Sequence, residues 1–97
     1  MAEEPTINHE ERDGNGAFLL LLDGERIGEM TYTRTGPERV NIDHTGVRSE
    51  FGGRGYARKL LDAAVAWARE SHTGVTSTCS YSNAQFERDA SIRDVLV

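Results

Sequence analysis

The sequence predicts an α+β fold, in which a mostly antiparallel sheet is followed by a central amphipathic helix and a C-terminal helix. In the first half, short apolar or β-branched runs alternate with glycine-containing turns, a pattern typical of antiparallel strands joined by hairpins. After residue 55 the apolar side chains recur with the period of a helix. The chain has 97 residues, so we expect a single domain over residues 1–97.

The first half predicts an edge strand followed by a three-stranded meander. We expect residues 1–5 to be disordered and Thr6–Arg12 to form the short edge strand. Ala17–Leu22 is continuously apolar, which predicts a strand buried on both faces. The β-branched residues of Arg26–Thr33 and the alternation of apolar and polar residues in Val40–Val47 predict the next two strands.

The alternation within the third strand of the meander also predicts which side chains share a face of the sheet. Successive side chains of a strand point to opposite faces. We therefore expect two sets, Val40, Ile42 and His44 on one face, and Asn41, Asp43 and Thr45 on the other.

The second half predicts a glycine-rich turn, a helix, a strand and a last helix. The turn is Gly52–Gly55, and Tyr56–Ser71 then places apolar residues at i, i+3, i+4 and i+7, which indicates an amphipathic helix. Val75–Cys79 is short and β-branched enough for a further strand. Ser82 or Asn83 is expected to cap the last helix.

The charge of the chain is acidic overall but unevenly distributed. The formal net charge is −5, which argues against a general binder of nucleic acids or anionic membranes. Residues 1–46 hold ten acidic and four basic side chains, whereas residues 48–59 hold four basic side chains and one acidic one. The local basic cluster favours one specific anionic ligand, with a solvated helix face as the alternative.

Composition also bears on compartment, membrane and metal. A single cysteine cannot form an internal disulfide, so we expect a cytoplasmic protein. Residues 1–9 have no apolar run of the kind found in signal peptides, and Ala17–Leu22 is too short to span a membrane. His9 and His72 have no partners at metal-ligand spacing, so we expect no metal site.

The turn Gly52–Gly55 is the candidate binding site. A helix N-terminus offers unpaired backbone N–H groups and partial positive charge, and glycine lets an anion approach the backbone closely. Arg48, Arg54 and Arg58 add positive charge near this turn, so pyrophosphate is the natural ligand. The spacing fits neither the Walker motif nor the dinucleotide fingerprint, whose third glycine position is Arg58 here. A purely structural turn is the alternative.

Four segments carry a recognisable pattern, and they are His44–Val47, Glu50–Ala57, Lys59–Leu61 and Cys79–Tyr81. In this order they resemble the acetyl-CoA segment of the GNAT superfamily of N-acetyltransferases. More narrowly, the chain is similar to a very small GNAT-like subfamily in which an HT-x-V strand end, an RG-x-G-x-A turn and a C-x-Y motif recur. The resemblance covers about residues 8–95 and implies a minimal GNAT (acyl-CoA N-acyltransferase) fold.

The resemblance implies that acetyl-CoA binds to the turn and to the strand before it. The N–H groups of Gly53–Ala57 would hold the pyrophosphate, and Val47 would pair with the pantetheine arm as an added strand does. Gly52 stands where the superfamily usually has Gln or Arg. The residues expected to bind acetyl-CoA are Val47, Arg48, Gly52, Gly53, Arg54, Gly55, Tyr56, Ala57, Arg58 and Asn83.

Acetyl transfer to an amine needs a neutral amine, a polarised carbonyl and a protonated leaving thiolate, and three residues, with a fourth as second choice, are candidates for catalysing it. Tyr81 lies where the superfamily often places a tyrosine that donates to the thiolate, with a core tyrosine as the alternative. Cys79 is either a nucleophile that forms an acetyl-enzyme or a small buried residue. His44 is a candidate base or water positioner, or a structural histidine, and Glu50 is the second choice for base.

The favoured hypothesis is an acetyl-CoA-dependent N-acetyltransferase that transfers the acetyl group directly to an unidentified amine in a ternary complex. One alternative is an acyl-CoA-binding or sensing module with little or no catalysis, and another is an interaction domain with a degenerate turn. The acidic first half favours a cationic amine, though only generically. We expect a monomer or a homodimer, since a chain this small could complete its acceptor side across a dimer.

Overall fold

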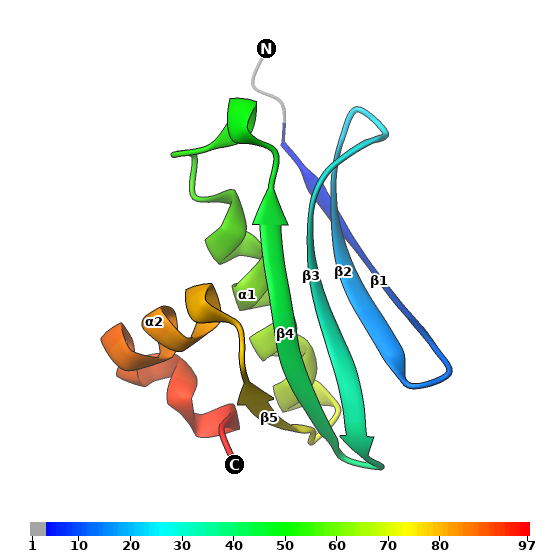
Figure 1. Cartoon of the computed structure of the whole chain (residues 1–97), viewed down its shortest axis with the longest axis vertical. Coiled ribbons are helices and arrows are strands. Elements are labelled where there is room, and N and C mark those ends of the chain that lie inside the picture. The colour runs from blue at the N-terminus through cyan, green and yellow to red at the C-terminus, as the bar shows by residue number, and fades with distance from the viewer. Residues whose placement is uncertain (1–3) are drawn as a thin grey trace.

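The computed structural model describes residues 4–97 and contains one mixed sheet with its helices packed beside it (Figure 1). The strand order is β1-β2-β3-β4-β5, where only the β4–β5 pair is parallel. The elements are β1 (Thr6–Arg12), β2 (Asn15–Leu22), β3 (Glu25–Gly36), β4 (Arg39–Val47), η1 (Ser49–Phe51), α1 (Tyr56–Glu70), β5 (Gly74–Ser77), α2 (Ser80–Arg88) and η2 (Ala90–Val95). The predicted α+β fold with a mostly antiparallel sheet is therefore confirmed. Of the segment 1–5 expected to be disordered, residues 1–3 lie outside the described residues.

The core lies between α1 and one face of the sheet. In Figure 1, α1 runs behind β4. The face that β1–β4 turn toward the viewer carries no helix among residues 4–97, and we call it the open face of the sheet. Leu20 and Met30 of the sheet and Leu60 and Leu61 of α1 are fully buried between these two layers. Burial of these side chains is the main force that holds α1 on the sheet.

The prediction that Ala17–Leu22 is buried on both faces was wrong. Phe18 and Leu20 face α1 and are buried, whereas Leu19 and Leu21 point to the other face and are half-buried. The reason is that, within residues 4–97, helices cover one face of the sheet only, so a strand can bury only alternate side chains completely.

The predicted sharing of faces in β4 was also wrong for two residues, because β4 contains a β-bulge. Tyr32 of β3 pairs with Ile42, but the preceding Thr31 pairs with His44, so Asp43 is the extra residue. Beyond the bulge the alternation is reversed. His44 therefore points to the open face, and Thr45 points to the face covered by the helices. The Asp43 carboxylate accepts hydrogen bonds from the hydroxyls of Thr31 (2.5 Å) and Thr33 (2.9 Å), which hold the bulge.

The strands β4 and β5 separate after a short parallel pairing. Only Arg39–Ile42 pairs with Gly74–Ser77, and the last backbone bond runs from the Thr78 N–H to the Ile42 carbonyl oxygen (2.9 Å). In Figure 1, β4 continues past this point while the chain after β5 bends away into α2. Residues Asp43–Val47 have no strand on this side within the described chain, and we call this segment the free β4 edge.

The C-terminal elements differ from prediction in their limits. The strand ends at Ser77 rather than Cys79, and α2 begins at Ser80 rather than after a cap at Ser82 or Asn83. Ser82 is fully buried, and its hydroxyl accepts a hydrogen bond from Ser77 (3.1 Å), so it serves the packing inside the first turn. The last helix is interrupted at Asp89, whose carboxylate caps the separate 3-10 helix η2 through the Ser91 N–H (2.9 Å).

Candidate functional site

The glycine-rich turn leaves the start of α1 open. Gly53 and Gly55 both have φ of +77°, a left-handed conformation that glycine adopts without strain. Gly55 is the N-cap, the first turn contains no acidic residue, and the first helical bond joins the Lys59 N–H to the Gly55 carbonyl oxygen (3.1 Å). The N–H groups that precede Lys59 therefore have no helical partner, which is the arrangement that binds an anion. A Cβ at position 53 or 55 would meet no atom within 4 Å, so the turn is also open to approach.

Two of the basic residues near the turn are held by neighbouring acids. Arg48 forms ion pairs with Glu25 and, at 2.8 Å, with Glu50. The same pairing occupies Glu50, the second choice for base. Arg58 binds Asp62 (2.8 Å) in its own helix and Asp89 at the end of α2. Hydrogen bonds to these two carboxylates raise the pKa of Arg58 above its usual value. Arg58 thus joins α1 to the C-terminal part of the chain, and much of its charge is compensated.

Arg54 differs from those two arginines. It lies in the turn itself, is exposed, and places its guanidinium carbon 5.3 Å from the centre of the Phe51 ring. No acidic partner is found for it in residues 4–97. Arg54 is therefore the arginine of this cluster best able to meet an added anion.

The free β4 edge presents backbone groups toward α2. The Arg48 N–H bonds to the Ile27 carbonyl oxygen of β3 (2.8 Å), so the backbone groups of Val47 and Thr45, which alternate with it, point away from β3. An extended ligand can add to such an edge by strand-like hydrogen bonds. The edge leads directly through η1 to the glycine-rich turn.

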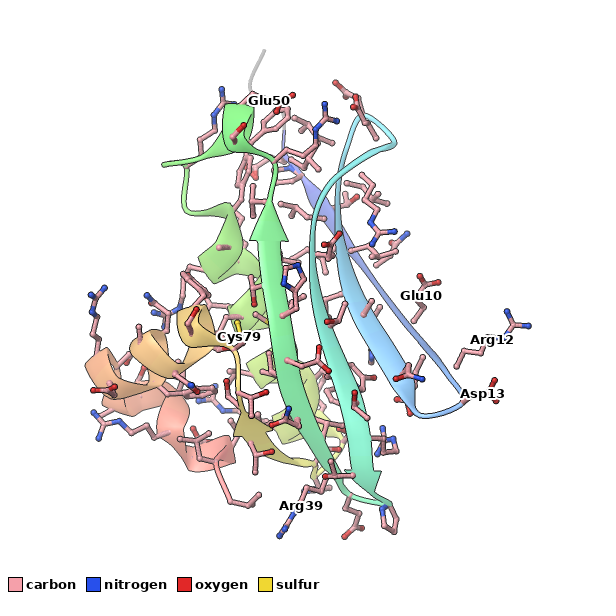
Figure 2. The ribbon with its side chains drawn as sticks, viewed as in Figure 1. Glu10, Arg12, Asp13, Arg39, Glu50 and Cys79 are labelled. Carbon is pink, nitrogen blue, oxygen red and sulfur yellow. The ribbon has the colours of Figure 1, made fainter. Side chains whose placement is uncertain are left out.

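Cys79 lies beside this edge, at the N-cap of α2 (Figure 2). Its side chain is buried, and its Sγ atom is 3.3 Å from the Thr45 hydroxyl, which the bulge has turned to this face. Burial acts to raise the pKa of the thiol, but hydrogen bonds with Ser82, with Thr45 and with the backbone of the first turn of α2 together outweigh burial and lower the pKa. Cys79 is a free thiol.

Tyr81 lies in the first turn of α2, on the side that faces α1. The ring is half-buried against the core. Burial raises the pKa of its hydroxyl, and the nearby Arg58 partly opposes this effect. The hydroxyl is therefore protonated at neutral pH and able to donate a proton or a hydrogen bond.

His44 lies on the open face, opposite Cys79 and Tyr81. Its Nε2 atom is 3.2 Å from an oxygen of Glu29, a residue of β3 that sequence analysis did not single out. The side chain of His44 is 57 % exposed and that of Glu29 is 29 % exposed. A signal for Glu29 would have required the β3–β4 register, because the two residues are distant in sequence.

Of the other residues predicted to bind acetyl-CoA, Gly52, Tyr56 and Ala57 lie in or next to the turn, whereas Asn83 does not. Tyr56 is buried in the core, and Ala57 is half-buried in the first turn of α1. Gly52 is exposed, with ordinary extended φ and ψ of −65° and 154°. Asn83 lines a separate groove between β5, α2 and the C-terminal residues, together with Thr76 and Leu96. The structure thus brings the turn, the free β4 edge, Cys79 and Tyr81 to one side, and leaves Asn83 outside this group.

Neither a metal-binding cluster nor a membrane-spanning helix is found in residues 4–97. These residues contain no group of three or more His, Cys, Asp or Glu side chains arranged to hold a metal ion. Among them there is also no helix long and apolar enough to cross a membrane.

Comparison with known proteins agrees with this arrangement. The family model described as GCN5-related N-acetyltransferase matches residues 17–95. The solved structure of a GCN5-like protein from Staphylococcus aureus has a TM-score of 0.68 and 31 % identity, covering 93 % of this chain and 87 % of that one. A GNAT family acetyltransferase from Elizabethkingia anophelis with acetyl-CoA bound has a TM-score of 0.68 and 14 % identity, covering 87 % and 72 % of the two chains.

A curated relative is also similar in sequence. Streptothricin acetyltransferase A from Bacillus subtilis (strain 168) is 26 % identical over 70 residues, which are 72 % of this chain and 40 % of that protein. The chain thus spans about two fifths of the length of this relative.

This fold, a sheet with a free strand edge beside a glycine-initiated, uncapped helix, is similar to solved structures of the GNAT class. The family match over most of the chain and the likeness to the S. aureus protein put this chain in that class. The chain belongs to the GCN5-related N-acetyltransferase family, as its motifs predicted.

Proposed function

We propose that this protein transfers an acetyl group from acetyl-CoA directly to an amine in a ternary complex. The observation that carries the proposal is that the uncapped start of α1 and the free β4 edge lie at the same end of the sheet. Together they offer one site for a pyrophosphate and an adjoining one for an extended arm. This combination suits CoA better than a simple phosphate.

The residues of the site fit the two polar parts of acetyl-CoA. The N–H groups of Gly53–Ala57 would receive the pyrophosphate, with Arg54 as the added charge. The backbone groups of Val47 and Thr45 would pair with the amides of the pantetheine arm. Arg48 and Arg58 would contribute less, because each is already paired with two carboxylates.

The two proton transfers of the reaction would then take place on opposite faces of the sheet. The amine nitrogen would form a bond to the thioester carbonyl carbon, and the C–S bond would break with its electron pair passing to sulfur. His44, on the open face, would accept the proton that the amine loses. Tyr81, on the helix-covered face, would give a proton to the leaving thiolate. The bulge at Asp43 is what separates the two groups in this way.

Cys79 supports a second route, in which its thiolate first takes the acetyl group. The lowered pKa of the thiol favours this route, whereas its burial beside Thr45 favours a packing role. Mass spectrometry after incubation with acetyl-CoA distinguishes the routes. A covalent acetyl group on Cys79 that disappears on adding amine would replace direct transfer as the mechanism.

A binding module without catalysis is the second candidate function. Two features favour it: Gly52 supplies no side chain at the position where the superfamily usually has Gln or Arg, and no helix covers the open face in residues 4–97. Such a protein would bind acetyl-CoA and CoA but release no thiol when amines are added.

The decisive experiment combines thermal unfolding with a thiol-release assay. A ligand present at 100 times its Kd stabilises the native state by about 2.7 kcal/mol, so acetyl-CoA and CoA should each raise the Tm. Thiol release is then measured with monoamines, polyamines and lysine peptides. Tyr81→Phe should lower kcat at least tenfold with the Kd of acetyl-CoA unchanged. No rise in Tm with either ligand would refute both candidate functions.

The proposal also covers the compartment, the domain organisation, the acceptor and the oligomeric state of the protein. We infer a cytoplasmic protein, supported by the free thiol of Cys79, and a single acetyltransferase domain, supported by the one sheet and one core of residues 4–97. The acceptor would be a cationic amine drawn to the acidic first half of the chain. Sedimentation equilibrium distinguishes the expected monomer from the homodimer. Asn83 stays a prediction that the separate groove does not favour.

A further inference from the structure

The open face of the sheet carries a histidine–carboxylate pair. The Nε2 atom of His44 lies 3.2 Å from Oε2 of Glu29, and the other oxygen of Glu29 accepts a hydrogen bond from Arg26 (3.0 Å). Glu29 is therefore held from both sides, by Arg26 in its own strand and by His44 in the next. The inference drawn from this pair rests on the proposed function, because it assigns Glu29 a part in the same reaction.

The local backbone is shaped to let the two side chains meet. Glu29 pairs with Gly46 across the β3–β4 ladder, two residues after His44. A Cβ at Gly46 would lie 3.1 Å from the Nε2 atom of His44 and 3.7 Å from Oε2 of Glu29. The imidazole thus lies over a glycine, in space that a side chain would fill. The bulge turns His44 to this face, and Gly46 leaves room for the ring.

The contact determines which nitrogen of a neutral imidazole carries the proton. An ionised carboxylate can only accept hydrogen bonds, so Nε2 must be the donor to Glu29. The neutral ring then has its lone pair on Nδ1, and Nδ1 has no hydrogen-bond partner within residues 4–97. A base must be unprotonated at the atom that takes the proton, and this arrangement reserves Nδ1 for that use.

We propose that Glu29 is a positioning residue that holds His44 in the Nε2–H tautomer, so that Nδ1 accepts the proton of the acceptor amine. When the amine nitrogen bonds to the thioester carbonyl carbon, its proton passes to Nδ1. The imidazolium that results is bonded through Nε2–H to the Glu29 carboxylate. Glu29 touches neither acetyl-CoA nor the amine and acts through His44.

Steady-state kinetics test the role of Glu29 in turnover. Glu29→Gln should lower kcat about tenfold to a hundredfold, the range found for partners that orient metal-ligating histidines, with the Kd of acetyl-CoA unchanged. Glu70→Gln is the matched control, because it removes the same charge from an exposed residue at the C-terminal end of α1, away from the free β4 edge and the glycine-rich turn. Gly46→Ala should lower kcat more mildly, since the ring need move by only a few tenths of an ångström.

A double-mutant cycle separates positioning from a merely structural role. In a His44→Gln background, Glu29→Gln should cause no further loss of kcat, because Glu29 acts through His44. The same loss in both backgrounds would overturn the proposal, as would equal activity of Glu29→Gln and Glu70→Gln.

The tautomer itself is measured without any turnover. A long-range ¹H–¹⁵N correlation spectrum, recorded where imidazoles are neutral, reports which ring nitrogen carries the proton. The His44 signals are assigned by their absence in His44→Gln. The wild-type protein should show the Nε2–H form, and Glu29→Ala should show a mixture. A mixture in the wild type would overturn the proposal. If the spectra are as expected and no amine is acetylated, the proposed function fails while the Glu29–His44 contact stands.

Discussion

The two ends of α1 differ in whether their backbone polar groups have hydrogen-bond partners. At the N-terminal end, Gly55 caps without a side chain, and the first N–H groups have no helical partner. At the C-terminal end, the Ser71 hydroxyl donates to the Trp67 carbonyl oxygen (2.7 Å), and the Thr73 N–H donates to that of Ala68 (2.8 Å). Unpaired donors cost stability and attract ligands, whereas paired ones stabilise the fold.

Side chains reinforce the contrast at the C-terminal end. The His9 ring stacks on Phe18 at 4.2 Å and meets the edge of Trp67 at 4.8 Å. The Tyr32 hydroxyl lies 2.6 Å from His9 Nε2 and donates to Glu11 at 2.7 Å. We call these five residues the aromatic cluster. Variants of this cluster should change stability without changing acetyl-CoA affinity, and variants of the glycine-rich turn should do the reverse.

The largest effect is expected from Trp67→Ala in the aromatic cluster. It removes contacts with three other rings and with Arg34, so the free energy of unfolding should fall by about 3 kcal/mol. Urea unfolding measures the loss, and calorimetry below the transition should return the wild-type Kd for acetyl-CoA. A weakened Kd in the folded variant would contradict the separation of the two ends.

Gly55→Ala should have the next largest effect, and the property affected most is the affinity for acetyl-CoA. A Cβ at φ of +77° costs about 1 kcal/mol, and it would also stand where the anion approaches, so acetyl-CoA should bind about tenfold more weakly. Gly14→Ala in the β1–β2 turn is the matched control, with φ of +81° and no close contact for a Cβ. It should show the same loss of stability and the wild-type Kd, and an equal loss of affinity would exclude a local role for Gly55.

Arg54→Ala should weaken acetyl-CoA binding by about fivefold, because it removes a cation near the turn that has no acidic partner in residues 4–97. The difference from wild type should shrink as salt is added. Arg39→Ala serves as the control, since Arg39 begins β4 at the opposite end of the strand (Figure 2). Isothermal titration at two salt concentrations checks both, and a salt-independent loss would exclude an electrostatic role.

The smallest effect concerns acid stability at the aromatic cluster. Hydrogen bonds from Arg34 and Tyr32 lower the pKa of Glu11 to about 2 from 4.5, so its stabilising contribution is complete above pH 4.5 and is lost as pH falls toward 2. Burial lowers the pKa of His9 below 6.5, so the unfolded chain takes up its proton first, and stability also falls as pH drops below 6.5.

Glu11→Gln tests this dependence. The Tm difference between wild type and variant should shrink as pH is lowered from 4.5 toward 2, because protonation then removes the same charge from wild type. Hydrogen bonds from Ser91 and Arg58 also lower the pKa of Asp89, to about 2. The contribution of Asp89 to acid dependence is therefore the same in wild type and variant. A constant Tm difference across this range would show that Glu11 is not responsible.

The parts of the fold that sequence alone predicted are those set by local interactions. The apolar repeat in Tyr56–Ser71 gave α1 to within one residue of its end, and the turn sequences gave the hairpins. The family motifs led to the glycine-rich turn, in which Gly53 and Gly55 adopt the positive φ that glycine tolerates best. Each of these depends on neighbours within a few positions in the chain.

The features that sequence analysis missed depend on contacts between distant residues. Regular alternation placed His44 on the helix-covered face, but the bulge at Asp43, held by Thr31 and Thr33, reverses it. Arg58 looked like a ligand for phosphate, yet its bond to Asp89 fastens α1 to the end of α2. The hydroxyl of Ser82 looked like a cap and is instead buried against Ser77.

By itself, the sequence determined the strands, the long helix, the glycine-rich turn and the family, because periodicity, turn chemistry and motif spacing are carried by neighbouring residues. Only the tertiary structure decided which polar groups are paired and which face each candidate occupies. Within residues 4–97 it leaves Arg54 without an acidic partner while it pairs Arg48 and Arg58, and it brings Glu29 of β3 to His44 of β4. The physical reason is that strand register and helix docking bring together side chains whose separation in the sequence carries no signal of their contact.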